Sequence, residues 1–272
     1  MIRVKLTIFI LLNFLNITAQ QSEIQYLSGT DAEHTSTWQF YCSEGNNSKK
    51  WSTIEVPSCW EQQGYGSYNY GHVKFEDRIK ETGLYKKTFS VPLAWKNIHI
   101  DLVFEGVMTD ATIKINGKLA GPTHQGAFYE FSYDVSKLLN YGKDNQIEVL
   151  VKKHSENMSV NHAERKSDYW VFGGIFRPVY LSAKPKEHIK NVAINATANG
   201  DFVSNINTSS LKKNTTLLVE IKTLDGKLVK KLNINTKGQT HSIQGKIDEV
   251  ETWTSETPNL YTATYKIMYK GA

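Results

Sequence analysis

The sequence is poor in cysteine, and the spacing of its two cysteines argues against two classes of site. Its 272 residues contain six prolines and two cysteines, Cys42 and Cys59. Neither the spaced ligand groups of a zinc site nor a Cys-x-x-Cys redox motif is present, so these functions are not expected. In an exported protein the two thiols either pair as a disulfide or stay free and buried, and the sequence leaves both alternatives open.

Long hydrophobic runs are also lacking, apart from one at the amino terminus. Arg3 and Lys5 precede the apolar run Leu6–Leu15, and the small residue Ala19 follows it. This order is typical of a secretory signal peptide, so we expect residues 1–19 to be removed and the protein to be exported to the periplasm or beyond. The run has about half of the roughly 20 residues that a membrane span needs, so a retained anchor is the weaker alternative. No cysteine closely follows the run, so a lipoprotein anchor is not indicated.

The sequence has no strong excess of charge of one sign. Its 32 basic and 27 acidic side chains give a formal net charge of +5, which falls to +3 when Arg3 and Lys5 are removed (5 − 2). The remaining lysines are dispersed along the chain. A nucleic-acid partner is therefore not expected, and after signal cleavage no membrane span remains.

Aromatic residues are abundant, with 14 Tyr and 6 Trp. They favour β-structure and suit contact with sugars, although they prove neither. Many lie among glycines in the segment Cys59–Thr82, which follows an alternating strand at Trp51–Val56. This segment either presents aromatic faces to a sugar or packs them under a long loop. The residues in question are Trp60, Tyr65, Tyr68, Tyr70, His72 and Phe75.

Short alternating strands separated by turn signals fill the rest of the chain. Asn116-Gly117 and Asp225-Gly226 predict tight hairpins, because a type I′ turn needs positive φ at both central positions. One helical turn capped by Asp134 is predicted at 134–139, and 154–167 is predicted to be a functional loop. The predicted strands are 84–91, 98–104, 111–115, 118–120, 146–152, 175–182, 189–197, 201–207, 215–223, 227–234, 241–247 and 262–269.

This pattern predicts an all-β protein with two domains, residues 20–183 and 184–272. A linker is expected at 183–188, which contains Pro185. The strand spacing of the second domain suits an immunoglobulin-like sandwich. Its final strand, 262–269, has no predicted partner, so we expect the natural polypeptide to continue.

The stretch Asp168–Leu181 combines a charged, aromatic loop with an apolar, β-branched strand. Gly173-Gly174 lies between them and allows positive φ or the close approach of another segment. Asp168 is therefore expected at an exposed rim of the domain, held in place by the rigid strand that follows it.

The order Asp-x-Trp-x-x-Gly-Gly-Ile-Phe-Arg at 168–177 resembles the amino-terminal signature of glycoside hydrolase family 2, the β-galactosidase and β-glucuronidase group. The resemblance implies a jelly-roll (galactose-binding-like) β-sandwich at 20–183, followed by an immunoglobulin-like β-sandwich that is cut short. Other segments that resemble the family are 104–107, 111–117, 133–135, Trp253 and 258–261.

The resemblance also implies a third domain that this chain lacks. In the family it is a TIM barrel with an acid/base glutamate and a nucleophilic glutamate, about 5 Å apart in retaining enzymes. No catalytic residue is therefore expected in this chain, and we predict that it hydrolyses nothing alone.

Candidate substrate-binding residues follow from the same resemblance. The family's aspartate that matches Asp168 reaches into the barrel mouth and hydrogen-bonds the terminal sugar, so Asp168 is expected to recognise substrate; a turn-stabilising role is the alternative. His162 and Glu164, in the preceding loop, are weaker candidates for sugar contact.

The remaining signature residues are expected to be structural. Trp170 is expected to pack and Arg177 to form an ion pair, and Gly173 and Gly174 complete the motif. No metal site is expected in this chain, because its histidines share no ligand spacing with cysteine or aspartate. Some β-galactosidases of the family bind sodium or magnesium near the active site, where Asp168 would supply part of a sodium shell and the missing barrel the rest.

The sequence thus predicts the exported, non-catalytic amino-terminal part of a β-galactosidase-like enzyme, which hydrolyses terminal β-linked sugars with retention. Its partners would be a carbohydrate and the missing barrel. The alternative is a free-standing carbohydrate-binding protein without enzymatic activity. The preferred sugar and the oligomeric state are not indicated.

Overall fold

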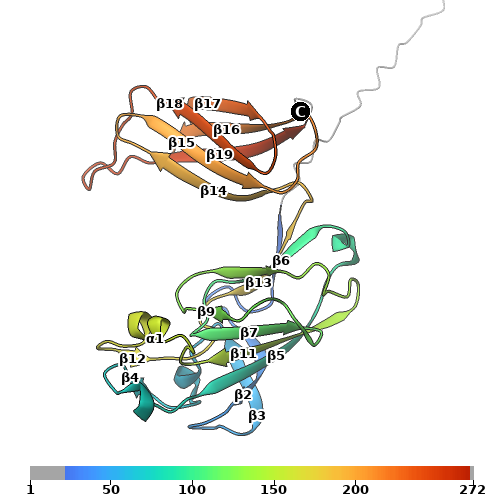
Figure 1. Ribbon diagram of the computed structural model, residues 1–272, viewed down its shortest axis with the longest axis vertical. Helices are drawn as coiled ribbons and strands as arrows, with labels where there is room; N and C mark the ends of the chain where they lie inside the picture. The colour runs from blue at the N-terminus through green and yellow to red at the C-terminus, as the bar shows by residue number, and fades with distance from the viewer. Residues whose placement is uncertain (1–21, 270–272) are drawn as a thin grey trace, which may run out of the picture.

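The computed structural model describes residues 22–269. These residues form two all-β units joined by a short connection (Figure 1). The first unit runs from β1 to β13 and the second from β14 to β19. The predicted signal peptide, residues 1–19, lies outside the described residues. Within the described range, no helix is long and apolar enough to cross a membrane. The all-β prediction is confirmed.

The first unit packs a four-stranded sheet against a larger antiparallel sheet. The smaller sheet has the order β1 (Glu23–Tyr26), β13 (Val179–Lys184), β6 (His99–Phe104), β10 (Phe131–Asp134). The larger sheet has the order β3 (Trp51–Val56), β2 (Ser36–Cys42), β5 (Thr82–Ser90), β11 (Asp144–Lys152), β7 (Asp110–Ile115), β8 (Lys118–Leu119), with β9 (His124–Gln125) also paired to β7. Short 3-10 helices lie at η1 (Trp60–Gln63), η2 (Phe75–Asp77) and η3 (Leu93–Trp95).

Alternation along the strands builds the core between these two sheets. In β11, Ile147, Val149 and Val151 are fully buried, while the residues between them face outward. This period of two is what a sheet with one covered face requires. The inward side chains meet Leu102 and Leu181 of the smaller sheet in one continuous core.

The second unit is a sandwich of two three-stranded sheets. One sheet has the order β14 (Ile189–Ala196), β15 (Asp201–Thr208), β18 (Thr240–Lys246), and the other has the order β17 (Leu228–Asn235), β16 (Thr215–Thr223), β19 (Tyr261–Tyr269). The core between them consists of Phe202, Ile206, Leu217, Val219, Ile221, Ile243 and Ile247.

The final strand corrects one sequence prediction. We expected it to lack a partner, but β19 pairs with β16 along its full length, from Tyr261 opposite Thr223 to Tyr269 opposite Thr215. The prediction was wrong because local turn signals do not show which strand of a sandwich occupies the central position. β16 is central here, since β17 pairs with its other edge.

Local predictions were partly right. Asn116 and Gly117 have φ values of 51° and 78°, as the predicted hairpin requires. The loop expected at 154–167 contains a helix, α1 (Met158–Glu164), capped by the Asn157 side chain, which accepts a hydrogen bond from Ser159 N (3.0 Å). Seven residues are too few to show a helical period in the sequence.

Two further boundaries differ from the sequence predictions. The helical turn expected at 134–139 is a hydrogen-bonded turn, in which Asp134 Oδ1 accepts from Ser136 N (3.0 Å). The strand predicted at 175–182 begins only at Val179, directly after Pro178, which has no N–H to donate. It then continues to Lys184, into the predicted linker.

Candidate functional site

A two-stranded ribbon joins the aromatic segment to the signature loop. β4 (Asn69–Tyr70) pairs with β12 (Trp170–Val171), and Gly71 N donates to Tyr169 O (2.8 Å). The sequence indicated neither strand, because two-residue strands carry no periodicity. The ribbon places the two aromatic segments side by side at one end of the first unit (Figure 1).

Asp168 lies at the exposed end of this ribbon, as the sequence predicted. Its Oδ1 accepts a hydrogen bond from the Tyr70 hydroxyl. Oδ2 has no partner within residues 22–269, so it is free to accept a hydroxyl hydrogen from a ligand. A carboxylate held by one hydrogen bond and open on the other side suits recognition of a sugar hydroxyl.

Trp170 is not buried, contrary to the expectation that it packs. It is 53% exposed and makes edge-to-face contacts with Tyr68 and Tyr70, at centroid distances of 5.8 and 5.3 Å. The pairing of β4 with β12 directs its ring outward. Trp170 and Tyr68 thus form an exposed aromatic surface beside Asp168.

A buried group of charges holds the backbone behind the ribbon. Gly173 N donates to both carboxylate oxygens of Glu61 (3.1 and 3.0 Å), and Lys153 Nζ lies 2.7 Å from Glu61 Oε1 and 3.1 Å from Glu81 Oε2. The side chains of these two ion pairs are fully buried. Burial raises the pKa of Glu61, and the ammonium of Lys153 acts against that shift. Such a network favours one geometry, because without Lys153 both buried carboxylates would lack a cation.

Both glycines of the motif are required by their surroundings. A Cβ on Gly173 would lie 2.2 Å from the Trp60 ring. Gly174 has a φ of +127°, and a Cβ there would lie 2.7 Å from Ser58 O. The two alternatives derived from the sequence therefore both occur: close approach at both glycines, and positive φ at Gly174.

Two arginines that the sequence did not single out brace the same loops. Arg165 is 1% exposed and donates to Phe172 O. Arg78 donates to Arg165 O (2.7 Å) and Gly71 O (2.6 Å). Burial lowers the pKa of Arg165 to about 10. Neither arginine belongs to a motif, so only the folded chain shows that they satisfy loop carbonyls.

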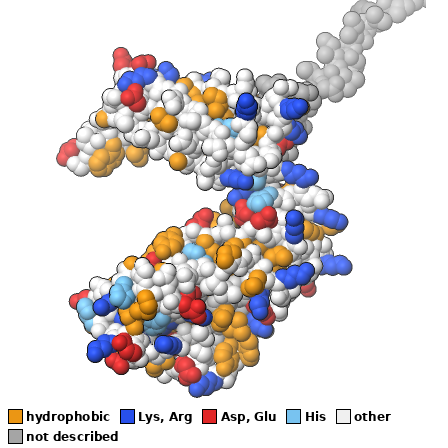
Figure 2. Space-filling view, in the orientation of Figure 1, with side chains coloured by type: hydrophobic (Ala, Val, Ile, Leu, Met, Phe, Trp, Pro, Cys, Tyr) orange, Lys and Arg blue, Asp and Glu red, His pale blue; other side chains and the backbone are white. Residues whose placement is uncertain are grey.

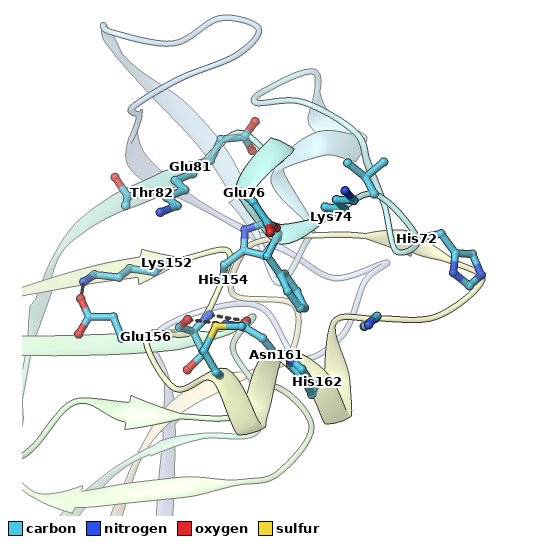
Figure 3. Close-up of a pocket in the computed structure, with 16 residues that line it drawn as sticks. His72, Lys74, Glu76, Glu81, Thr82, Lys152, His154, Glu156, Asn161 and His162 are labelled. Carbon is cyan, nitrogen blue, oxygen red and sulfur yellow. Dashed lines mark hydrogen bonds and ion pairs between the residues drawn. The ribbon is translucent and has the colours of Figure 1, made fainter.

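A cavity of about 950 Å³ lies beside the ribbon, between η2, α1 and the adjoining ends of β5 and β11 (Figure 3). His162 lines it and stacks on Phe75 (centroids 5.6 Å). His154 also lines it, and burial lowers the pKa of this imidazole to about 3, so it is neutral at physiological pH. Asp168 and Glu164 are not among the lining residues.

Glu164 makes contacts within the protein that occupy both carboxylate oxygens. Oε2 accepts from Ala127 N (2.8 Å) and Oε1 from the Tyr129 hydroxyl (2.9 Å). Glu164 thus ties α1 to the 126–129 segment. Sugar contact by this side chain stays a prediction, and it would require these bonds to be shared.

Arg177 does not form the expected ion pair with any residue between 22 and 269. Instead its Nη1 donates to Glu105 O (3.4 Å) and Phe128 O (3.3 Å), and its guanidinium lies 5.1 Å from the Phe176 ring centroid. In the described structure, backbone carbonyls thus take the place of the expected carboxylate, and a structural role stays the prediction.

The two cysteines are free thiols. Cys42 is buried and Cys59 is partly exposed, and burial raises the pKa of each to about 11. The free-thiol alternative is therefore correct, and thiols with such high pKa values are poor nucleophiles at neutral pH.

The described side chains around Asp168 do not form a group of three or more potential metal ligands of the His, Cys, Asp or Glu type. Across residues 22–269, no three His, Cys, Asp or Glu side chains are grouped as ligands. Sodium or magnesium near Asp168 in the full-length enzyme, which the resemblance implies, stays a prediction.

Comparison with known protein families accounts for both units. The family described as "Glycosyl hydrolases family 2, sugar binding domain" matches residues 31–185, and "Glycosyl hydrolases family 2" matches residues 186–272. The chain therefore belongs to glycoside hydrolase family 2. The boundary between the two matches falls within the predicted linker at 183–188.

Curated relatives carry glycosidase names. A putative beta-glucuronidase of Formosa agariphila is 28% identical over 235 residues, which cover 83% of this chain and 27% of the relative. A beta-galactosidase of Alteromonas mediterranea is 30% identical over 235 residues, covering 78% of this chain and 22% of the relative. The chain thus spans about a quarter of the length of these relatives.

Solved structures of the same group share the fold. A putative beta-galactosidase from Bacteroides fragilis superposes with a TM-score of 0.71 at 24% identity, covering 92% of this chain and 39% of that one. A Bacteroides uniformis beta-glucuronidase gives a TM-score of 0.70 at 23% identity, covering 92% and 31%. These matches show that the arrangement of two β-sandwiches is that of family-2 proteins.

Proposed function

We propose that this chain is the non-catalytic amino-terminal part of a β-galactosidase-like glycosidase, and that Asp168 recognises the terminal β-linked sugar. The whole enzyme would hydrolyse that sugar with retention, using a barrel that supplies the two glutamates. The observation that carries the proposal is the combination of two family-2 domain matches with Asp168 held on an exposed rim. Export by the signal at 1–19 is part of the proposal.

The first test asks whether the purified chain has activity. Aryl β-galactoside and aryl β-glucuronide are offered to it at high protein concentration, and we expect no turnover. Turnover that disappears in Asp168→Asn would contradict the proposal. Turnover that is unchanged in this variant would point to a contaminating enzyme, so the variant serves as the matched control.

The second test asks whether Asp168 recognises sugar. The natural coding sequence is read past Ala272, and the full-length product is assayed with and without Asp168→Asn. We expect a rise in KM or a fall in kcat/KM of about 100-fold or more, because a recognition group left without its partner costs discrimination. Unchanged kinetics would leave Asp168 as a turn-stabilising residue and overturn its proposed role.

The second candidate function is a free-standing carbohydrate-binding protein. One observation favours it: β19, the last described strand, pairs with β16 along its whole length and so is held in the sheet as its edge strand. A stop codon after Ala272, together with cooperative unfolding and glycan binding by the chain alone, would favour this candidate. A reading frame that continues with two strand-end glutamates would favour the glycosidase.

A further inference from the structure

The cavity beside the ribbon carries an excess of uncommitted positive charge. Three of its lining lysines, Lys74, Lys80 and Lys166, form no ion pair with another residue of the described chain. Among the lining carboxylates, Glu76 likewise has no ion-pair partner between residues 22 and 269. The cavity therefore presents three free cations against one free anion.

The other lining charges are paired within the protein, and Glu81 shares its one cation, Lys153, with Glu61. Lys152 pairs with Glu156, and Glu81 faces the buried Lys153 at 3.1 Å. Figure 3 shows the Lys152 and Glu156 side chains directed toward each other at one side of the cavity. These groups do not cancel the field of the three lysines.

A further cation lies beneath the wall. The Arg78 guanidinium lies 4.4 Å from the centroid of the Phe75 ring, and Arg78 is itself buried. Clefts with walls of low polarity and one sign of charge concentrate ligands of the opposite sign. Figure 2 shows His and basic side chains, with acidic ones among them, at the α1 end of the first unit.

The size and the apolar part of the wall suit a sugar rather than a simple ion. About 950 Å³ lies at the upper end of the range for small-molecule sites, roughly 300–1,000 Å³. Val73 and Met158, which are 41% and 51% exposed, add apolar surface to the lining. A simple anion needs neither the volume nor the apolar contact.

Each of the two chain segments that form the ribbon also contributes a residue to the lining of the cavity, close in sequence to Asp168 or to its partner Tyr70. Lys166 precedes Asp168 by two positions, and His72 follows Tyr70, the hydrogen-bond partner of Asp168, by two positions. A glycan whose terminal residue reaches Asp168 therefore has its neighbouring residues next to the cavity.

We propose that this cavity binds an acidic sugar residue, bearing a carboxylate or a sulfate ester, in the same glycan that Asp168 recognises. The proposal rests on the proposed function for its choice of a glycan as ligand. It goes beyond that function in assigning a negatively charged substrate class and a second contact region formed by Lys74, Lys80 and Lys166.

The experiment measures binding of two matched tetrasaccharides to the purified chain by calorimetry at low salt. One contains β-linked glucuronate and the other is its carboxyl-reduced, neutral form; a sulfated form of the neutral compound distinguishes the two sources of charge. We expect the acidic compound to bind about tenfold more tightly than the neutral one, and the preference to shrink at high salt because the lysines are exposed. Equal binding of acidic and neutral compounds would overturn the proposal.

Matched lysine variants test the location. K74Q/K80Q/K166Q is expected to reduce the acid preference to within about twofold. K213Q/K227Q/K237Q removes the same charge from exposed sites of the second unit and is expected to keep the preference. An equal loss in both variants, or equally tight binding of a short single-stranded DNA, would indicate a general anion effect and overturn the proposal.

Asp168→Asn separates this inference from the proposed function. If both hold, the variant weakens both tetrasaccharides by the same factor and the acid preference remains. If the variant changes neither affinity while the preference persists, the recognition role of Asp168 fails and the acidic cavity stands. If the variant weakens both compounds and there is no acid preference, the cavity proposal fails and the role of Asp168 stands.

Discussion

The two units of this chain bury charge very differently. The first unit buries Glu61, Glu81 and Lys153 next to the ribbon that presents Asp168. The described part of the second unit has no buried Asp, Glu, Lys or Arg, and its ion pairs, such as Lys246 with Asp201, lie at the surface. Apolar burial is enough to hold a sandwich together. The buried charges are added where a loop must keep one particular shape.

The largest expected effect comes from breaking the buried charge group. Lys153→Met leaves Glu61 and Glu81 buried without a cation, which typically costs about 3–5 kcal/mol of unfolding free energy. Urea unfolding followed by tryptophan fluorescence measures it, since five of the six tryptophans lie in the first unit. Lys246→Met in the second unit is the control and is expected to leave the midpoint unchanged, because both partners are exposed. Equal shifts would remove the contrast between the units.

Glycine substitutions give the next effect. Gly173→Ala places a Cβ 2.2 Å from the Trp60 ring, which is itself fully buried, and we expect a loss of about 2–3 kcal/mol. Gly245→Ala, in the second unit, meets only the Leu232 side chain at 2.8 Å. That side chain is flexible, so a smaller loss is expected. Thermal unfolding monitored by circular dichroism compares the two, and a larger loss at Gly245 would contradict this account.

The pH dependence of stability should also differ between the units. The pKa of His154 is about 3 in the folded state against about 6.5 when unfolded, so the unfolded chain binds more protons between these values. Its contribution is fully present above pH 6.5 and is lost as the pH falls toward 3. We expect His154→Gln to flatten the fall in the urea midpoint between pH 6.5 and 4. His241→Gln, at a residue whose pKa burial also lowers, should flatten it less; the reverse order would refute the assignment.

Single hydroxyl deletions give the smallest expected effects. Tyr265→Phe removes the partner of Ser204, which is fully buried, so the unfolding free energy should fall by about 1 kcal/mol. Tyr70→Phe removes the donor to Asp168, which is exposed and can bond to water instead, so stability should change less. Equilibrium unfolding of both variants is the measurement. A larger loss for Tyr70→Phe would show that the rim is coupled to the core.

The sequence predicted what alternation and motif order encode. Strands such as 146–152, the positive φ values at Asn116-Gly117 and the exposed position of Asp168 all depend on local pattern, and the structure agrees with them. The β4–β12 ribbon and the hydrogen bond from Arg78 to Arg165 O were not predictable, because they join segments far apart in the chain. Trp170 was misjudged for the same reason: its exposure depends on which strand lies beside it.

The anchoring of the ribbon has a consequence for how such proteins diversify. The wall segment 72–77 lies between two fixed points, the Gly71 N to Tyr169 O bond and the Arg78 side chain that holds Gly71, Val73 and Arg165 carbonyls. A segment whose backbone is held at both ends and at Val73 can change its exposed side chains without displacing Asp168. Substitutions at the exposed side chains of this segment are therefore expected to alter the neighbouring cavity and to leave Asp168 in place.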